Sequence, residues 1–373
     1  MNKKLYTLFA IVILVIVGGY LIGQQSSSDT IKIGALYPLT GGLASYGEPA
    51  QKVAQIAIDD INASGGINGK KLELVVSDHQ CDPKVAVSNF QKLNGVDGIH
   101  VFTSVACTGT VVSIVPELQT KDAVLLGTVT SGNKLTGISS NFFRNWASDA
   151  QEAKLLSDYV RKSGFKNIAV IYEDTDYAKG LKLSMEENLK DTNVKILSES
   201  FTSGATDVKT QLTKLQALKP DALFVSVQTV TSGEIVLTQM DQLKFRPVSL
   251  LINDNILKSS QLIKNHPSLE GAIGGDYAIA SNDRLNAVLA KYKAKYGQDC
   301  PQINICATEY DAINLFAQAI KTNGNSASGV KSYLASTTFD GVSGMISFGT
   351  DGNRNAAEYS LFKIVNGQAQ IIK

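Results

Sequence analysis

Residues 31–76 begin with the apolar run IKIGALY (31–37) and end with the run KLELVV (71–76). Between the two runs, apolar side chains recur at helical spacing, at Val53, Ile56, Ala57 and Ile61. Two short apolar runs on either side of an amphipathic helix are typical of a β-α-β unit with parallel strands. This stretch therefore predicts an α/β fold.

The same alternation continues along the chain, with further predicted strands at Ile99–Phe102, Val124–Leu126, Ile168–Tyr172, Ala222–Val227 and Val248–Ile252. Strands that alternate with helices form parallel sheets covered by helices on both faces. A chain of 373 residues is long enough for two cores. We expect two doubly wound lobes, with the first crossing between them at residues 141–148.

Helix ends have chemical signals in two places. Asp149 and Glu152 have the spacing of a capping box, and Gly164 suits a left-handed C-terminal cap. These residues predict a helix from Ala150 to about Ser163. The glycines at 65, 66 and 69 follow a helical pattern and precede a strand, which favours a cap and turn over a phosphate-binding loop.

Charge and motifs exclude several classes of protein. The net charge is +1, and without residues 1–28 there remain 33 basic against 34 acidic side chains, which argues against nucleic-acid binding. The patterns GxGxxG, GxxxxGK[ST], GxSxG and HExxH are absent, so we predict neither an enzyme nor a cofactor. Three histidines and no CxxC spacing argue against a metal site.

The N-terminus predicts export. Lys3 and Lys4 precede an uncharged stretch, Leu5–Ile22, which is just long enough to span a membrane. No AxA-like cleavage site or lipid-attachment cysteine follows it, so residues 1–28 are predicted to be an uncleaved membrane anchor with the rest of the chain outside the cytoplasm. A cleaved signal peptide is the alternative.

All four cysteines lie beyond this segment, at Cys81, Cys107, Cys300 and Cys306. An oxidising compartment permits disulfides, and the even number fits two of them. Buried free thiols are the alternative.

Several segments, read in this order, resemble the leucine/isoleucine/valine-binding proteins, the substrate-binding components of amino-acid ABC transporters. They are IKIGALYPLTG (31–41), SYG (45–47), DINASGGING (60–69), CDP (81–83), DY (176–177), YDA (310–312) and FDGVSG (339–344). The resemblance implies a type I periplasmic binding fold with a three-segment hinge. It implies one lobe of residues 29–147 and 280–339 and another of 148–279 and 340–373. It also implies bridges Cys81–Cys107 and Cys300–Cys306.

An amino acid needs donors for its carboxylate and an acceptor for its ammonium. Thr108, Gly109 and Thr110 come between a predicted strand and a helix, where backbone N–H groups and hydroxyls bind anions. By the resemblance, Thr108 and Ser131 fall on carboxylate-binding positions, and the carbonyl of Val129 falls on an ammonium acceptor. Simple helix capping is the alternative role for both hydroxyls.

The resemblance places further residues in the ligand cleft. Tyr46 and Tyr177 match positions that close over the ligand from opposite lobes. Gln228 stands where relatives often carry tyrosine, and the acidic ammonium-binding position falls near Asn253-Asp254-Asn255. Asp254 is the expected partner of the ligand ammonium, and Asn253 is the alternative. In this sequence Asp254 is equally well suited to a turn or to capping a helix. Trp146 is a possible additional cleft residue.

These observations predict an extracytoplasmic solute-binding protein of an ABC importer, which passes an amino acid or similar small polar ligand to a membrane permease. A ligand-sensing receptor ectodomain with the same fold is one alternative. A small amide or peptide ligand is another, because the amide of Gln228 demands a polar partner.

Overall fold

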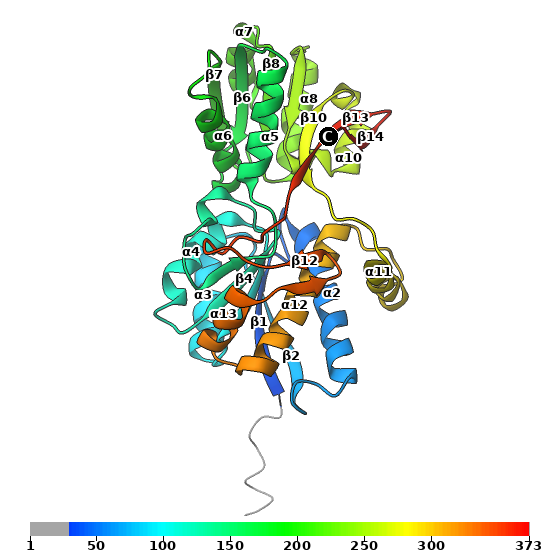
Figure 1. The fold of residues 1–373 in the computed structure, drawn as a ribbon. Helices are drawn as coiled ribbons and strands as arrows, with labels where there is room; N and C mark the ends of the chain where they lie inside the picture. The colour runs from blue at the N-terminus through cyan, green and yellow to red at the C-terminus, as the bar shows by residue number, and fades with distance from the viewer. Residues whose placement is uncertain (1–29, 373) are drawn as a thin grey trace, which may run out of the picture.

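The computed structural model describes residues 30–372, which form two α/β lobes stacked end to end (Figure 1). The first lobe is built on a parallel sheet in the order β2-β1-β3-β4-β5. Its strands are β1 (Thr30–Tyr37), β2 (Lys71–Asp78), β3 (Val101–Val105), β4 (Val124–Thr128) and β5 (Phe142–Arg144). The α/β fold and the parallel pairing that the sequence predicted are confirmed.

Helices cover both faces of this sheet because successive side chains of each strand point to opposite sides. Val101 of β3 packs on the face of α2 (Ala44–Ala63), α12 (Ile303–Asn323) and α13 (Ala327–Ser336). Its neighbour Phe102 packs against α3 (Pro83–Gly95) and α4 (Thr108–Leu118). A 3-10 turn, η1 (Asn133–Leu135), follows β4.

The second lobe has a seven-stranded sheet in the order β14-β13-β10-β9-β8-β6-β7, in which only β13 and β14 run antiparallel to their neighbours. The strands are β6 (Asn167–Glu173), β7 (Lys195–Phe201), β8 (Ala222–Ser226), β9 (Ser249–Ile252), β10 (Ile273–Tyr277), β13 (Tyr359–Val365) and β14 (Gln368–Ile371). One face is covered by α5 (Asp149–Lys162) and α6 (Asp176–Leu189). The other is covered by α7 (Lys209–Ala217), α8 (Val230–Gln242), α9 (Asp254–Leu257) and α10 (Ser260–Asn265), with η2 (Pro267–Leu269) after them.

The chain passes between the sheets three times, after β5, after β10 and before β13. After β10 it returns to the first lobe as α11 (Asp283–Tyr296), which packs on α2 and α12. The hairpin β11 (Phe339–Gly341) and β12 (Gly344–Ile346) follows α13. Ile346 and Phe348 lie in the core of the first lobe. The third crossing is therefore later than the boundary at residue 340 that the resemblance implied.

Helix α5 begins differently from the prediction. Ser148 is its N-cap and accepts a hydrogen bond from the Ala150 N–H, so Asp149 is already the first helical residue. Glu152 is fully buried, and its Oε1 accepts from the backbone N–H of Asp254, 3.0 Å away. The predicted capping box is wrong because Glu152 is drawn into the second lobe's interior. Gly164 does follow the helix with the expected positive φ of 71°.

The predicted anchor, residues 1–28, lies outside the described residues. Within residues 30–372, no helix combines the length and the apolar character that crossing a membrane requires.

Candidate functional site

A small cavity of about 30 Å³ lies between the lobes, where the carboxyl ends of both sheets face each other. Its lining consists of Leu43, Tyr46, Ala106, Cys107, Thr108, Val129, Ser131, Tyr177, Gln228, Asp254 and Asn255. Loops at the carboxyl ends of parallel strands are the usual ligand-binding part of such folds. The structure thus brings together seven of the nine residues that the sequence analysis singled out.

The first lobe contributes the start of α4. Thr108 is its first residue, and the preceding Cys107 makes no side-chain capping bond, so no side-chain oxygen caps this helix end. The Thr110 amide donates to the Cys107 carbonyl at 3.0 Å. Such an uncapped N-terminus favours an anion. The alternative role of Thr108 as a simple cap does not apply. The other two predicted residues of this turn do not line the cavity: the Thr110 hydroxyl donates to the Cys107 carbonyl at 2.7 Å, and Gly109 lies opposite Asp176.

The second cavity-lining loop of the first lobe follows β4. Val129 has a φ of 55°, a left-handed conformation that β-branched residues rarely adopt. The loop is held by Arg144, whose Nη1 donates to the carbonyls of Ser131 at 2.6 Å and Gly132 at 3.0 Å. Its Nε also donates to Asn353 in the third crossing. Burial lowers the pKa of the Arg144 guanidinium. Sequence reasoning noted Arg144 only at the crossing and missed this positioning role.

Contacts between the lobes close the cavity. The Tyr46 hydroxyl donates to Oδ1 of Asn255 at 2.5 Å, and Nε2 of Gln228 lies 3.0 Å from the sulfur of Cys81. A space of this size holds about one water molecule. The lobes must therefore separate, or their side chains must move, before a whole amino acid enters.

The second lobe contributes an acidic wall centred on Asp254. Asp254 is the first residue of α9, and the residue before it, Asn253, makes no capping bond. One oxygen of Asp254 accepts from the Tyr177 hydroxyl, and the other lies 2.7 Å from Nζ of Lys258. Asp254 is therefore in the cavity and not a cap, but it is already paired. Sequence reasoning missed Lys258, although its i+4 spacing from Asp254 was a signal for an ion pair.

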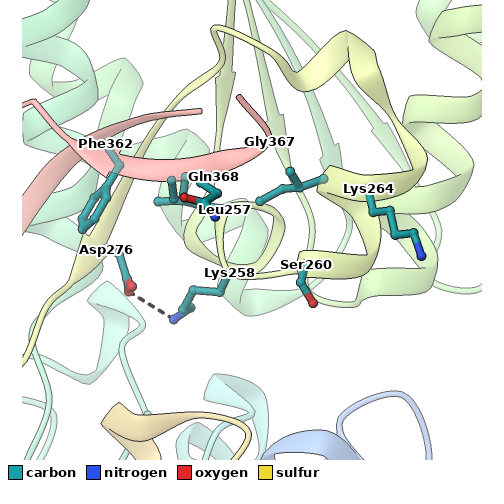
Figure 2. Close-up of a pocket in the computed structure, with 10 residues that line it drawn as sticks. Leu257, Lys258, Ser260, Lys264, Asp276, Phe362, Gly367 and Gln368 are labelled. Atoms are coloured by element: carbon teal, nitrogen blue, oxygen red, sulfur yellow. Dashed lines mark ion pairs between the residues drawn. The ribbon is translucent and has the colours of Figure 1, made fainter. Parts of the chain in front are cut away.

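Lys258 connects this wall to the crossings. Its ammonium also lies 3.3 Å from Oδ1 of Asp276, at the end of β10 (Figure 2), and 5.6 Å from the ring centre of Trp146 in the first crossing. Trp146 is buried and meets Tyr277 edge-on at 5.0 Å. Trp146, the possible cleft residue, does not line the cavity.

The acidic wall also includes Asp149, Glu152 and Asp276, and the pKa of each of these carboxyl groups is raised. Burial, reinforced by the charge of Asp254, raises the pKa of Asp149 to about 7. Burial also raises the pKa of Asp276 to about 6 and that of Glu152 well above its ordinary value. The wall therefore favours any additional positive charge that comes close to it.

A larger hollow of about 560 Å³ lies behind Lys258, between α9–α10 and the strands β13 and β14 (Figure 2). All the residues that line it belong to the second lobe, such as Leu257, Asp276 and Phe362. It lies outside the space between the lobes, so it is not the candidate site.

Two disulfides, Cys81–Cys107 and Cys300–Cys306, are formed. The bridges implied by the resemblance are confirmed, and the free-thiol alternative is wrong. Cys107 lines the cavity, so the first bridge ties the loop after β2 to the start of α4 beside the candidate site.

The sequence profile of a family described as periplasmic binding protein matches residues 30–369. The chain belongs to this periplasmic binding protein family. Members are substrate-binding proteins, and the family places the chain outside the cytoplasm. It is 31% identical over 197 residues to Leu/Ile/Val-binding protein homolog 3 of Brucella melitensis, covering 52% of this chain and 53% of that protein. With homolog 7 of the same species it shares 27% identity over 91% of this chain and 89% of the relative.

Solved structures of the family agree with the fold. A leucine-binding protein LivK from Thermotoga maritima superimposes with a TM-score of 0.80 at 21% identity, covering 92% of this chain and 98% of that one. LivJ from Streptococcus pneumoniae, in complex with isoleucine, gives 0.75 at 26% identity, covering 91% and 98%. The alignments with the first curated relatives span about half the length of some of them. The type I periplasmic binding fold is confirmed.

Proposed function

We propose that this chain is the extracytoplasmic solute-binding protein of an ABC importer and captures an amino acid between its lobes. The observation that carries the proposal is the chemistry of the cavity. An uncapped helix start and the hydroxyls of Thr108 and Ser131 lie on one side, and the acidic wall of Asp254 lies on the other. Such an arrangement suits the carboxylate and the ammonium of one small molecule. LivJ and the leucine-binding relatives support the same ligand class.

The acceptor for the ammonium has two parts in this proposal. Val129 lines the cavity from the first lobe and offers its carbonyl, and Asp254 lines it from the second and offers its carboxylate. Tyr46 and Tyr177 close the ends of the cavity with one polar edge each. Capture and release of the ligand, with no chemical change, is the whole reaction that we propose.

The partner in this proposal is an ABC permease, and the uncharged stretch Leu5–Ile22 tethers the protein to the membrane beside it. N-terminal sequencing of the protein from membranes tests the tether. A mature sequence that starts near Ser26 contradicts it.

A thermal-shift screen of the purified protein against the twenty amino acids, small amides and aromatic acids tests the ligand class. A cognate amino acid at one hundred times its Kd should raise the free energy of unfolding by about 2.7 kcal/mol. If only aromatic acids or only amides stabilise the protein, the ligand belongs to that class and is not an amino acid. Loss of the ligand's mass over time would indicate an enzyme instead.

A further inference from the structure

Four carboxyl groups meet behind the cavity in the second lobe. Asp149 and Glu152 come from α5, Asp254 from α9 and Asp276 from β10. The first two are fully buried and Asp254 is 5% exposed. Lys258 forms ion pairs with Asp254 and Asp276. Within residues 30–372, Asp149 and Glu152 form no ion pair, so the cluster holds more acidic groups than its lysine neutralises.

Three oxygens of the cluster lack hydrogen-bond partners within the same described part of the chain: Oδ2 of Asp149, Oε2 of Glu152 and Oδ1 of Asp276. Only the last of these three lies beside a cation, 3.3 Å from the Lys258 ammonium. The second oxygens of Asp149 and Glu152 do accept hydrogen bonds. Tyr359 donates to Oδ1 of Asp149 at 3.2 Å, and the Asp254 N–H donates to Oε1 of Glu152. An ionised oxygen without partners in such a place is costly, whereas a protonated one is not.

The other titratable groups around the cluster are one guanidinium and the tyrosines, of which Tyr177 and Tyr359 donate to cluster carboxylates. Arg144 favours ionised Asp149, but its guanidinium donates to Ser131, Gly132 and Asn353. Tyr177 donates to Asp254, and Tyr46, across the cleft, donates to Asn255. Burial raises the pKa of each of these two tyrosines, so neither supplies a proton near neutral pH. The exchangeable protons therefore belong to the carboxyl groups.

Resting on the proposed binding of an amino acid, we propose that the ligand ammonium enters beside Asp254 in exchange for a proton. The pair Asp149–Glu152 holds this proton in the unliganded protein. When the ammonium arrives, the O–H bond of that carboxyl breaks, the proton leaves for solvent, and the new carboxylate balances the ligand's charge. The amino acid keeps its own protons throughout.

The sign of the pH dependence follows. Binding releases a proton, and at lower pH this release costs more free energy. The affinity for the amino acid therefore falls as the pH falls. Release of one proton corresponds to about a tenfold change in affinity per pH unit. The pKa of Asp149 near 7 places this dependence close to neutral pH.

The first experiment needs no ligand. A carboxyl whose pKa is raised by folding binds more protons in the native state, so its contribution to stability is lost as the pH rises through the folded pKa. Chemical denaturation between pH 5 and pH 8 should show that the free energy of unfolding of the unsubstituted protein falls as the pH rises. The free energy of unfolding of Glu152→Gln should fall less steeply. Glu309 and Asp311, also buried with raised pKa values, contribute equally to both proteins. Glu187→Gln, at an exposed position of α6, is the matched control. Equal slopes in all three proteins overturn the inference.

The second experiment titrates L-leucine into the full chain by calorimetry at pH 7, in phosphate and in Tris. Because Tris takes up a proton with much more heat than phosphate, a released proton makes the two enthalpies differ. The difference should shrink in Glu152→Gln and vanish with 4-methylpentanoate, which has no ammonium. Equal enthalpies for L-leucine overturn proton exchange. Absence of binding by L-leucine counts against the proposed ligand class, and the denaturation series then decides whether the cluster is protonated.

Discussion

Gly132 shows how tightly the carboxylate side of the cavity is built. A Cβ at this position would lie 2.3 Å from Cγ2 and 2.4 Å from Oγ1 of Thr108. Any side chain at residue 132 must therefore displace Thr108, which lines the cavity. Sequence reasoning identified Thr108 and not this glycine, because a close approach between two loops leaves no local pattern.

Gly132→Ala should weaken ligand binding at least about tenfold, or about 1.4 kcal/mol. The expected loss of folding stability is about 1–3 kcal/mol from overpacking. Calorimetric titration and urea denaturation measure the two effects. Gly180→Ala is the control, since nothing lies within 4 Å of its added Cβ in α6, and it should gain up to about 1 kcal/mol of stability. Unchanged affinity in Gly132→Ala would remove Thr108 from the ligand site.

Asp254 and Lys258 form a pair whose loss has separable consequences. Asp254→Asn should weaken binding of the amino acid by about 3–5 kcal/mol, because the ligand ammonium loses its carboxylate. It should also lower stability, because Lys258 loses one of the two carboxylates with which it forms ion pairs. The double variant Asp254→Asn/Lys258→Met should regain stability without regaining affinity, which a double-mutant cycle measures. Recovery of affinity in the double variant would contradict the proposed role of Asp254.

At the scale of the elements, β1 to β4, β6, β8 and β9 and their parallel pairing followed from apolar runs alternating with helical spacing, as in residues 31–76. The strands β7 and β10 and the antiparallel β13 and β14 were not predicted. The start of α5 was not predicted correctly either, since Asp149 and Glu152 look like capping residues until the fold places Asp254 beside them. Periodicity reports which side of an element is buried. It does not report which distant residue meets it there.

The two disulfides constrain loops of very different length. Cys81–Cys107 spans 26 residues and Cys300–Cys306 spans 6. Because a longer loop restricts the unfolded chain more, Cys81→Ser/Cys107→Ser should cost about 2–4 kcal/mol of stability, and the other double variant less. Denaturation curves of the two variants give the comparison.

Affinity provides a second readout for the same variants. Cys107 lines the cavity, whereas Cys300 and Cys306 pack against α11. Only the first double variant should therefore bind the amino acid more weakly. An equal loss of affinity in both would mean that the bridges act through global stability alone.

At the scale of the whole molecule, the lobes are tied by single side-chain contacts, such as Tyr46 to Asn255. Tyr46→Phe removes this hydrogen bond, which should cost about 0.5–1.5 kcal/mol of ligand affinity and shift the unliganded protein towards a more open form. Small-angle scattering should show a larger radius of gyration. Tyr333→Phe loses a comparable bond to Gln318 within the first lobe and should change neither quantity. A compact Tyr46→Phe protein with unchanged affinity would contradict this.

The cavity as a whole was more predictable than its charge balance. Tyr46, Thr108, Val129, Ser131, Tyr177, Gln228 and Asp254 were all named from motif order, because each follows a strand at the same edge of its sheet. Lys258 and Arg144 were not: Lys258 had only its i+4 spacing from Asp254 as a signal, and its second partner Asp276 and the Arg144 partner Asn353 are distant in the sequence. Motif order identifies the loops of a site. The buried ion pairs behind those loops depend on three-dimensional neighbours.

Trp146 is the single tryptophan of the chain, and it lies at the first crossing with Tyr277 against its ring edge and the Lys258 ammonium over its face. Indole emission responds strongly to a nearby charge and to exposure to solvent. Any rotation of the lobes that moves Lys258 or opens the crossing should therefore change the fluorescence of the native protein. The molecule carries its own optical reporter of opening and closing, so the rate of ligand capture is measurable by stopped flow without a dye.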